Sequence, residues 1–302
     1  MQLSRRQFLK LCGGSAIALG FSDTLLAQVV FALEKAVEGN PAVIWLQGSS
    51  CTGCSVSLLN SVHPTIEEVL LKIISLRFHP NVSAASGDLA IKTIEETAKS
   101  GKFYLVVEGS IATKEDGLYT IIGEHGDKGI TMVDWMRSLG KDAAGVLAFG
   151  TCSAFGGIPA AKPNPTGAMS VREFFAKEKI ATPVINVSGC PPHPDWMVGT
   201  LAHLLSYGLP KMDEDGRPLL FYGKNQHENC PFRGYYEEKK FAKYFGDEGC
   251  RYVLGCKGPF AYADCWYRRW NNGPNWCVQN AICLGCVESG FPDALSPMYW
   301  NE

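Results

Sequence analysis

The sequence has 302 residues, of which 46% are hydrophobic and 19% charged, and its formal net charge is −2. This length allows a sizeable core and two domains. A pI near 6.3 argues against nucleic acid as a partner, because nucleic-acid-binding domains are usually basic. Past the N-terminal region no apolar stretch is long enough to cross a membrane, so any membrane attachment is expected to come through another protein.

Residues 1 to 32 resemble a twin-arginine export signal. Arg5 and Arg6 precede an apolar stretch, 11 to 21, that is too short to span a bilayer. This pattern predicts export to the periplasm by the twin-arginine route, which generally carries proteins already folded around a cofactor. Eleven of the twelve cysteines lie beyond residue 50 and would therefore remain in the mature chain.

Residues 40 to 208 alternate apolar runs with helical patterns. This alternation predicts an α/β domain in which helices cover both faces of a parallel sheet. In chain order, the patterns predict strands at 42–46, 103–107, 145–149 and 183–187, and helices from about 55 and at 65–77, 88–99, 131–139 and 195–207.

Four cysteines follow the ends of three of these strands. Cys51 and Cys54 come after the first strand, Cys152 after the third and Cys190 after the fourth. Because the carboxyl ends of parallel strands meet at one edge of an open sheet, the four thiols can converge there. The sequence therefore predicts one site with four ligands at this edge.

From residue 209 to 302 the regular patterning fades, and only 235–245 is predicted as a helix. The spacing of the remaining cysteines and one histidine gives two further sets: His227, Cys230, Cys250 and Cys256, and then Cys265, Cys277, Cys283 and Cys286. A segment with so little patterning would struggle to bury a core, so we expect metal clusters at its centre.

Three kinds of chemistry could use these cysteines. Eleven is an odd number, and export in the folded state favours a preassembled cofactor, so a disulfide framework is disfavoured. Any one set of four could bind a structural zinc ion. Three sets in one chain favour redox-active iron-sulfur clusters, for which thiolates are the standard ligands. The sets use all eleven cysteines, which leaves none for a separate catalytic metal in this chain.

An ordered series of motifs after residue 40 closely resembles the small subunit of nickel-iron hydrogenases. The motifs are Gly-x-x-Cys51-Thr-Gly-Cys54-Ser, Gly150-Thr-Cys152-Ser, Gly189-Cys190-Pro-Pro-His-Pro, His227-Glu-Asn-Cys230-Pro, Gly255-Cys256-Lys-Gly-Pro, Arg269-Trp-Asn-Asn and Cys283-Leu-Gly-Cys286. The resemblance implies a flavodoxin-like N-terminal domain and a mostly irregular iron-sulfur domain after it.

The same resemblance implies a role for each set. The Cys51 set would hold a proximal four-iron (4Fe-4S) cluster, the His227 set a distal four-iron cluster, and the Cys265 set a medial cluster between them. Hydrogen would react at a nickel-iron centre in a partner large subunit. This chain would then pass the electrons to a periplasmic acceptor such as a multihaem cytochrome c, as half of a reversible uptake hydrogenase heterodimer.

Finer details resemble the nickel-iron-selenium branch. Most relatives have proline where this chain has Cys277, so a fourth thiolate predicts a four-iron medial cluster; without Cys277 as a ligand it would be a three-iron one. Val56 stands where many relatives have glutamate. Gly53 and Gly157 stand where oxygen-tolerant relatives add cysteines, so a six-cysteine proximal site is not expected. Any selenocysteine would lie in the partner.

Two other protein classes remain as alternatives. A quinone-reductase subunit of the complex I type shares the first domain, but it characteristically has adjacent cysteines there and lacks the second domain. A zinc-scaffold protein would use the same ligands without redox chemistry, and it would be colourless. His193, three residues after Cys190, is expected either to support the first site by a hydrogen bond or to have a structural role.

Overall fold

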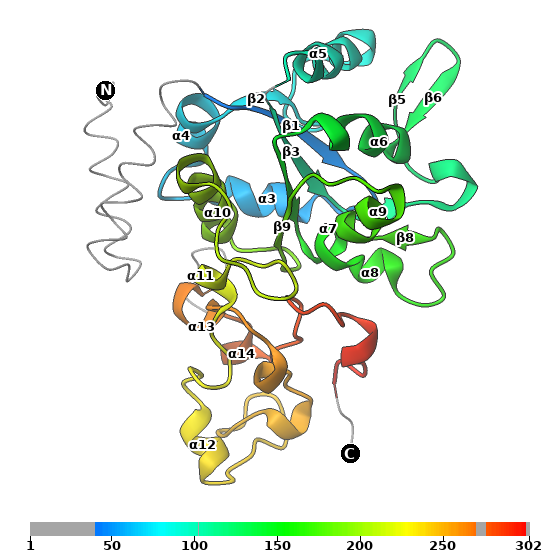
Figure 1. Cartoon of the computed structure of the whole chain (residues 1–302). Coiled ribbons are helices and arrows are strands. Elements are labelled where there is room, and N and C mark those ends of the chain that lie inside the picture. The colour runs from blue at the N-terminus through cyan, green and yellow to red at the C-terminus, as the bar shows by residue number, and fades with distance from the viewer. Residues whose placement is uncertain (1–39, 102, 270–275, 300–302) are drawn as a thin grey trace.

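The computed structural model describes residues 40–101, 103–269 and 276–299. The first part folds around a five-stranded parallel sheet in the order β2-β1-β3-β7-β9 (Figure 1). The strands are β1 (Ala42–Gln47), β2 (Ser75–Phe78), β3 (Phe103–Glu108), β7 (Gly145–Phe149) and β9 (Val184–Val187). This is the flavodoxin-like order, in which the direction of winding reverses beside β1. It confirms the predicted fold class.

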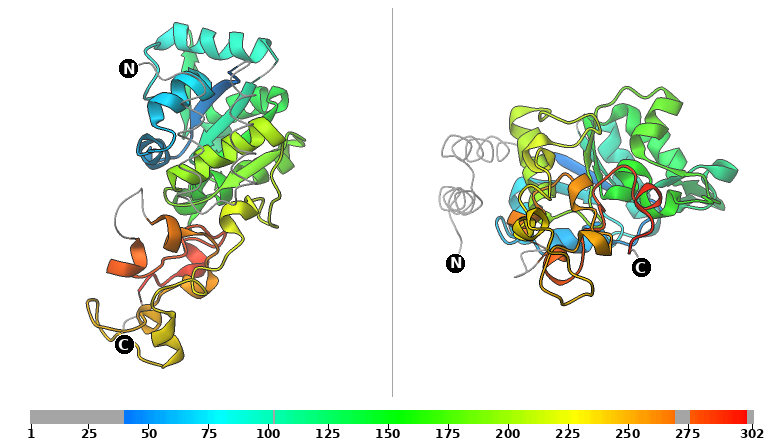
Figure 2. Two further views of the ribbon diagram at one scale, coloured as in Figure 1. Left: turned by 90° about the vertical axis from the view of Figure 1, so that its left-hand side faces the viewer. Right: turned by 90° about the horizontal axis from the view of Figure 1, so that it is seen from below.

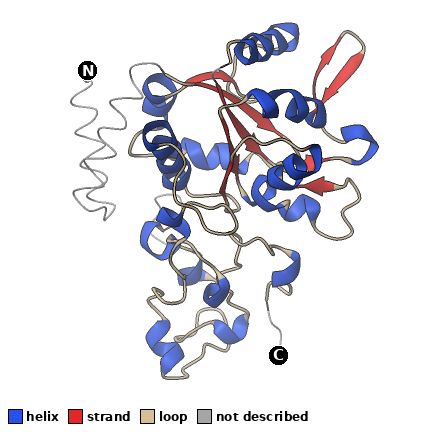
Figure 3. Cartoon of the chain, in the orientation of Figure 1, coloured by secondary structure: helices blue, strands red, loops and turns tan. Residues whose placement is uncertain are grey.

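Alternation along the strands gives the sheet two buried faces. In β1, Val43 and Trp45 pack on one face, and Ile44 and Leu46 pack on the other. Figure 3 shows helices on both sides of the strands. The first face is covered by α3 (Gly53–Leu59), the π-helix η1 (Val69–Ile73) and α10 (Pro194–Tyr207), and the second by α5 (Gly87–Lys99), α6 (Met132–Asp142) and α9 (Val171–Glu178).

Three of the covering helices begin at well-formed caps. The side chain of Thr131 accepts a hydrogen bond from the backbone N–H of Asp134 at the start of α6. Ser170 does the same at the start of α9. Helix α10 begins with His193 as its cap and Pro194 in the first turn, where the missing N–H costs little. These helices, with α5, confirm the predictions at 88–99, 131–139 and 195–207.

The helix predicted at 65–77 is only partly correct. A capping box between Thr65 and Glu68 starts α4 (Ile66–Glu68), which continues into η1, but the chain then enters β2. Strand β2 is an edge strand that pairs with β1 from Ser75 onward. Four residues directly after a helix are too few to show an alternating pattern of their own.

Smaller elements complete the sheet domain. They are the pair β4 (Ile111–Ala112) and β8 (Ala168–Met169), the hairpin β5 (Ile121–His125) and β6 (Lys128–Thr131), and the short helices η2 (Lys114–Gly117), α7 (Thr151–Phe155) and α8 (Gly157–Ala160). Helices α7 and α8 follow β7 directly, so they lie at the carboxyl end of the sheet.

The part of the chain after residue 208 is mostly irregular, as predicted. Its short helices are α11 (Leu219–Tyr222), α12 (Arg233–Glu237), η3 (Tyr252–Leu254), η4 (Gly258–Phe260), α13 (Cys265–Arg268), α14 (Cys277–Asn280) and η5 (Asp293–Leu295). The helix predicted at 235–245 is wrong beyond Glu237. Lys239 has a left-handed φ of 55°, and the chain turns so that the N–H of Ala242 donates to the carbonyl of Cys250. That pairing is not encoded in the local pattern.

One apolar core continues from the sheet into the C-terminal segment, which lies directly beside the sheet domain (Figure 2). Trp196 of α10 and Tyr222 of α11 share this core with Ala261, Ile282 and Val287. The C-terminal segment therefore has an apolar core in addition to its expected metal sites. Within the described ranges, no helix combines the length and the hydropathy needed to span a membrane.

Candidate metal centres

The structure brings together, at the carboxyl edge of the sheet, Cys51, Cys54, Cys152 and Cys190. Burial raises the pKa of the Cys54 thiol well above its usual range, and the nearby carboxylate of Glu108 and the three other cysteines raise it further. Burial also raises the pKa of Cys152 to about 12. A cationic metal group bound to the four sulfurs would offset this repulsion, so the residues present fit such a group.

Glu108, at the end of β3, is a site residue that the sequence analysis missed. Its side chain is 1% exposed. It accepts hydrogen bonds from the N–H of Cys54 at 3.0 Å, the hydroxyl of Ser55 at 2.5 Å, Trp45 at 3.2 Å and Gln47 at 3.1 Å. The carboxylate therefore anchors the loop that carries two of the cysteines. The sequence did contain a signal for this residue, a charged side chain at the end of an apolar strand, because charged residues are rarely buried unless they are paired.

A cavity of about 510 Å³ is lined by Cys265, Cys277, Cys283 and Cys286. Cys265 and Cys277 are the first residues of α13 and α14. Burial raises the pKa of Cys286 to about 12, whereas a hydrogen bond from Cys283 lowers the pKa of Cys277. Four thiols around a space of this size fit a group of several atoms.

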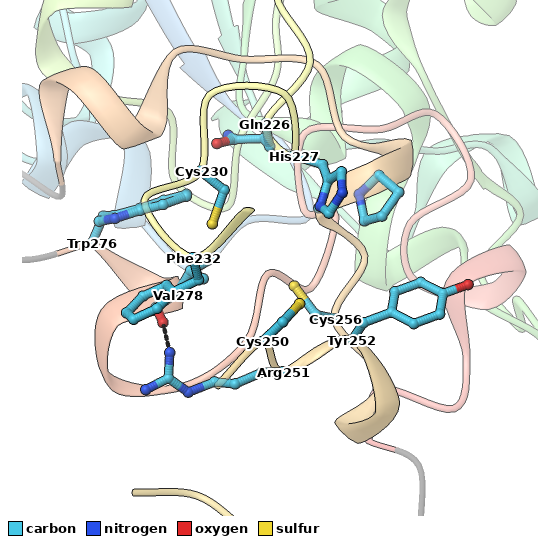
Figure 4. Close-up of a pocket in the computed structure, with 12 residues that line it drawn as sticks. Gln226, His227, Cys230, Phe232, Cys250, Arg251, Tyr252, Cys256, Trp276 and Val278 are labelled. Carbon is cyan, nitrogen blue, oxygen red and sulfur yellow. Dashed lines mark hydrogen bonds between the residues drawn. The ribbon is translucent and has the colours of Figure 1, made fainter. Parts of the chain in front are cut away.

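A second cavity, of about 20 Å³, is lined by His227, Cys230, Cys250 and Cys256, and Figure 4 shows the sulfurs and the imidazole around one space. The backbone N–H of His227 donates a hydrogen bond to Asn225 Oδ1 at 2.8 Å, and this bond stabilises the turn that carries His227 and Cys230. Burial, followed by the charge of Arg233, lowers the pKa of His227. A lowered pKa favours the neutral imidazole that a metal ligand needs.

Neighbouring sets are in contact at both ends of the Cys265 set. Cys190 of the first set lines the larger cavity together with Cys286, and it is close enough to affect the pKa of that thiol. The N–H of Cys283 donates to the sulfur of Cys256 at 3.4 Å. The Cys265 set therefore lies between the other two, and its CxxC pair contacts one neighbouring set at each end.

The spacing of these donors differs from that of a single-ion site. Among the residues that the structure describes, no three His, Cys, Asp or Glu side chains lie close enough together to hold one metal ion. A zinc ion needs its four donors about 2.0–2.3 Å from one point. That the residues of the three sets are metal ligands stays a prediction.

Some predictions are not tested by these residues. The export signal at 1–32 and all but the first residue of the Arg269-Trp-Asn-Asn motif lie outside the described ranges, and the domain limits near 40 and 208 stay predictions. His193 is 1% exposed, and its Nδ1 accepts a hydrogen bond from the N–H of Asp195 at 3.1 Å. This cap of α10 supports the structural alternative for His193.

Family comparisons divide the chain into two matching regions. Residues 51–204 match the family described as the 20 kDa subunit of NADH ubiquinone oxidoreductase. Residues 222–299 match the family described as the C-terminal part of the NiFe/NiFeSe hydrogenase small subunit. The two matches contain the first set of cysteines and the other two sets respectively.

Individual relatives match over nearly the whole chain. The chain is 53% identical to the periplasmic NiFeSe hydrogenase small subunit of Desulfomicrobium baculatum, with complete coverage of both chains. It is 39% identical to the hydrogenase-2 small chain of Escherichia coli, over 96% of this chain and 77% of that one.

Solved structures show the same fold. The reduced, active NiFeSe hydrogenase of Desulfomicrobium baculatum superposes with a TM-score of 0.84 at 54% identity, over 87% of this chain and 100% of that one. The oxidised NiFeSe hydrogenase of Desulfovibrio vulgaris Hildenborough gives a TM-score of 0.85 at 52% identity, over 88% and 99%. The similarity therefore includes both the sheet domain and the irregular segment.

Proposed function

The chain belongs to the small subunits of nickel-iron and nickel-iron-selenium hydrogenases, and we propose that it is the electron-transfer subunit of an uptake hydrogenase of the nickel-iron-selenium type. As a hydrogenase small subunit, it is part of an enzyme that also needs a large subunit. The match of residues 222–299 sets it apart from the complex I alternative, which lacks this second region.

Three iron-sulfur clusters are the cofactors that we propose for this chain. When bound, they would supply carriers that each accept and release one electron. The proposed ligands are Cys51, Cys54, Cys152 and Cys190 for the proximal four-iron cluster, Cys265, Cys277, Cys283 and Cys286 for the medial four-iron cluster, and His227, Cys230, Cys250 and Cys256 for the distal four-iron cluster.

The observation that carries the proposal is the closeness of neighbouring sets. Cys190 lines the same cavity as Cys286, and the N–H of Cys283 donates to the sulfur of Cys256, so each set lies next to the following one. Electron tunnelling falls steeply with distance, and these contacts leave no wide gap along the row. The arrangement supports a continuous path from the carboxyl edge of the sheet to the surface near His227.

We propose that the large subunit docks around the first set and carries the nickel-iron centre. Cys51 is exposed, and Val56 and Leu59 of α3 are 55% and 52% exposed. Exposed apolar side chains beside a metal site suit a protein interface. Every described cysteine belongs to one of the three sets, so nickel would need thiolates from the partner.

The proposed location is the periplasm, reached by twin-arginine export. Relatives from Desulfomicrobium baculatum and Solidesulfovibrio fructosivorans are periplasmic hydrogenase small subunits by name. The His227 set lies at the end of the row of sets that is farthest from the first set. We propose that electrons pass from there, through the half-buried His227, to an acceptor such as a multihaem cytochrome c.

Two preparations test the proposed role, the isolated chain and its complex with the large subunit. The complex should reduce a dye with hydrogen, and the isolated chain should not, because its thiols are committed to electron carriers. Cross-links to the large subunit should cluster near Cys51. Hydrogen-dependent activity in the nickel-free chain, or cross-links only to residues 209–302, would contradict the proposal.

A second experiment tests the fourth thiolate of the medial set. Replacement of Cys277 by proline should leave one iron corner without a ligand and convert a four-iron into a three-iron cluster. Electron paramagnetic resonance of the oxidised complex should then show a three-iron signal that the wild type lacks. A stoichiometric three-iron signal in undamaged wild type would mean that Cys277 is not a ligand.

A further inference from the structure

Arg251 is a buried cation in the wall of the 20 Å³ cavity at the His227 set. It directly follows Cys250 in the chain, lines this cavity and is only 8% exposed. Figure 4 shows its guanidinium facing the carbonyl of Val278. Because an arginine side chain keeps its proton in proteins, the wall of this cavity carries a permanent positive charge.

Hydrogen bonds and a ring contact hold the guanidinium in one position. Nη1 donates to the carbonyl of Val278 at 2.6 Å, and Nη2 donates to the carbonyl of Gln279 at 3.2 Å. The guanidinium carbon lies 4.7 Å from the centre of the Phe232 ring, and Phe232 lines the same cavity. Both carbonyls belong to α14, which begins with Cys277. The cation is therefore fixed between the 20 Å³ cavity and the helix that carries a proposed medial ligand.

The positive charge has no carboxylate partner within the described ranges. Arg217 and Arg268 are also buried, and each contacts carboxylates, whereas no ion pair of the described residues includes Arg251. Its Nε is buried and has no hydrogen-bond partner. A buried charge without an opposite charge nearby costs free energy. A four-iron cluster with three thiolate ligands is an anion, so a cluster bound by the adjoining set would supply the opposite charge.

We propose that the charge of Arg251 raises the reduction potential of the distal cluster. This inference rests on the proposed function. Reduction adds a negative charge to the cluster, so a fixed cation stabilises the reduced state more than the oxidised state, and burial limits the screening by water. The residues that line the 510 Å³ cavity do not include Arg251, so its effect on the medial cluster should be smaller.

The test uses the complete complex with three variants of Arg251. Arg251→Gln removes the charge and keeps a hydrogen-bond donor, Arg251→Met removes both, and Arg251→Lys keeps the charge. Potentiometric titration followed by electron paramagnetic resonance measures the potentials, and the nitrogen coupling from His227 identifies the distal cluster. The distal potential should fall in the glutamine and methionine variants and stay near the wild-type value in the lysine variant.

Lys243→Met is the matched control. Lys243 is exposed and lies in the same loop, between Cys230 and Cys250. Its replacement removes the same charge from a position where water and salt screen it. The distal potential of this variant should therefore equal that of the wild type. The iron content of every complex is measured alongside, so that only variants with all three clusters are compared.

Several outcomes would overturn the inference. These are an unchanged distal potential in both neutral variants, an equal fall in Arg251→Lys, and an equal fall in Lys243→Met. A fall in Arg251→Met alone would assign the effect to the hydrogen bonds and not to the charge. Loss of the distal cluster from the neutral variants would show that Arg251 is needed for assembly, which also contradicts the inference. A wild type without any reducible cluster that has a nitrogen ligand would instead overturn the proposed function.

Discussion

At the scale of single residues, the loops that carry the proposed ligands are held in place by other, buried polar side chains. Glu108 shows this most clearly, because its carboxylate accepts hydrogen bonds from several surrounding donor groups. They include the backbone N–H of Cys54 and the hydroxyl of Ser55, both in the first turn of α3. The carboxylate thus holds the cysteine loop against β3.

Glu108→Gln should destabilise the complex although it changes few atoms. The new amide NH2 would face other donors, such as the side chain of Gln47, and leave buried hydrogen bonds unmade at a cost of about 1–3 kcal/mol. Thermal unfolding of the purified complex measures the loss. The control is Glu124→Gln, which changes an exposed carboxylate in the same way and should have little effect. Equal effects would contradict the role of Glu108.

His193 should make stability depend on pH. Burial lowers its pKa from 6.5 to about 4 in the folded chain. The charge of Asp195 opposes this lowering of the pKa, and the charge of Arg268 adds to it. Between pH 6.5 and 4 the unfolded chain binds a proton that the folded chain does not, so stability present above pH 6.5 is lost as the pH falls, by on the order of 3 kcal/mol in total.

The variant His193→Asn tests this dependence, because asparagine is a good helix cap and does not titrate. Between pH 7 and pH 5 the unfolding temperature of the wild type should fall further than that of the variant. Parallel curves for the two proteins would mean that His193 does not carry the pH dependence.

At the scale of elements, the short helix α7 connects three segments at the carboxyl edge of the sheet. The residue that caps its N-terminus is Gly150, whose φ of 93° favours glycine. The buried hydroxyl of Thr151 donates to the carbonyl of Cys286 at 2.5 Å and accepts from the N–H of Gly189 at 2.9 Å. One side chain thus joins the loops that carry the first and the medial sets.

Thr151→Val should destabilise the complex by about 2 kcal/mol, because it keeps the shape and leaves two buried backbone groups unpaired. Thr151→Ser retains the hydroxyl and should stay near the wild type. Thermal unfolding and the rate of iron release to a chelator are the measurements. If serine and valine have the same effect, the methyl group rather than the hydroxyl matters.

At the scale of the whole molecule, buried ion pairs fasten the C-terminal segment to the sheet domain. Arg268 of α13 contacts Asp195 of α10 at 3.0 Å and Asp264 at 2.7 Å, and the indole N–H of Trp196 donates to Asp264 at 2.6 Å. Within the C-terminal segment itself, Arg217 pairs with Glu288 at 3.1 Å. These contacts keep the sheet domain and the segment with the medial and distal sets in a constant relative position.

Arg268→Met should therefore have a large effect on stability. Burial raises the pKa of Asp264 and Arg268 opposes the rise, so the variant would leave carboxyl groups buried without their cation, at about 3–5 kcal/mol. Arg137→Met removes a more exposed pair with Glu178 and should cost about 1 kcal/mol or less. The free energy of unfolding of the two variant complexes can be measured with a denaturant. Equal losses of stability in the two variants would contradict this expectation.

The parallel sheet and the mostly irregular segment after it could be predicted from the sequence alone, and the grouping of the cysteines into three sets is a prediction from their spacing. The segments 103–107 and 145–149 are continuous apolar runs, and such runs are typical of parallel strands that are buried on both faces. The paired spacings Cys51-x2-Cys54 and His227-x2-Cys230 are local as well, and the family follows from such motifs in order. The predictions failed where the pattern was short or misleading, at β2 and beyond Glu237.

The contacts between distant segments depend on the tertiary structure, which brings Cys190 beside Cys286 and the carboxylate of Glu108 against the backbone N–H of Cys54. Cys190 and Cys286 are almost a hundred positions apart, and their contact depends on the core shared by α10, α11 and the C-terminal loops. Glu108 has no distinctive spacing from any proposed ligand. Periodicity and spacing describe what the chain does over a few residues, whereas these contacts arise when distant segments pack together.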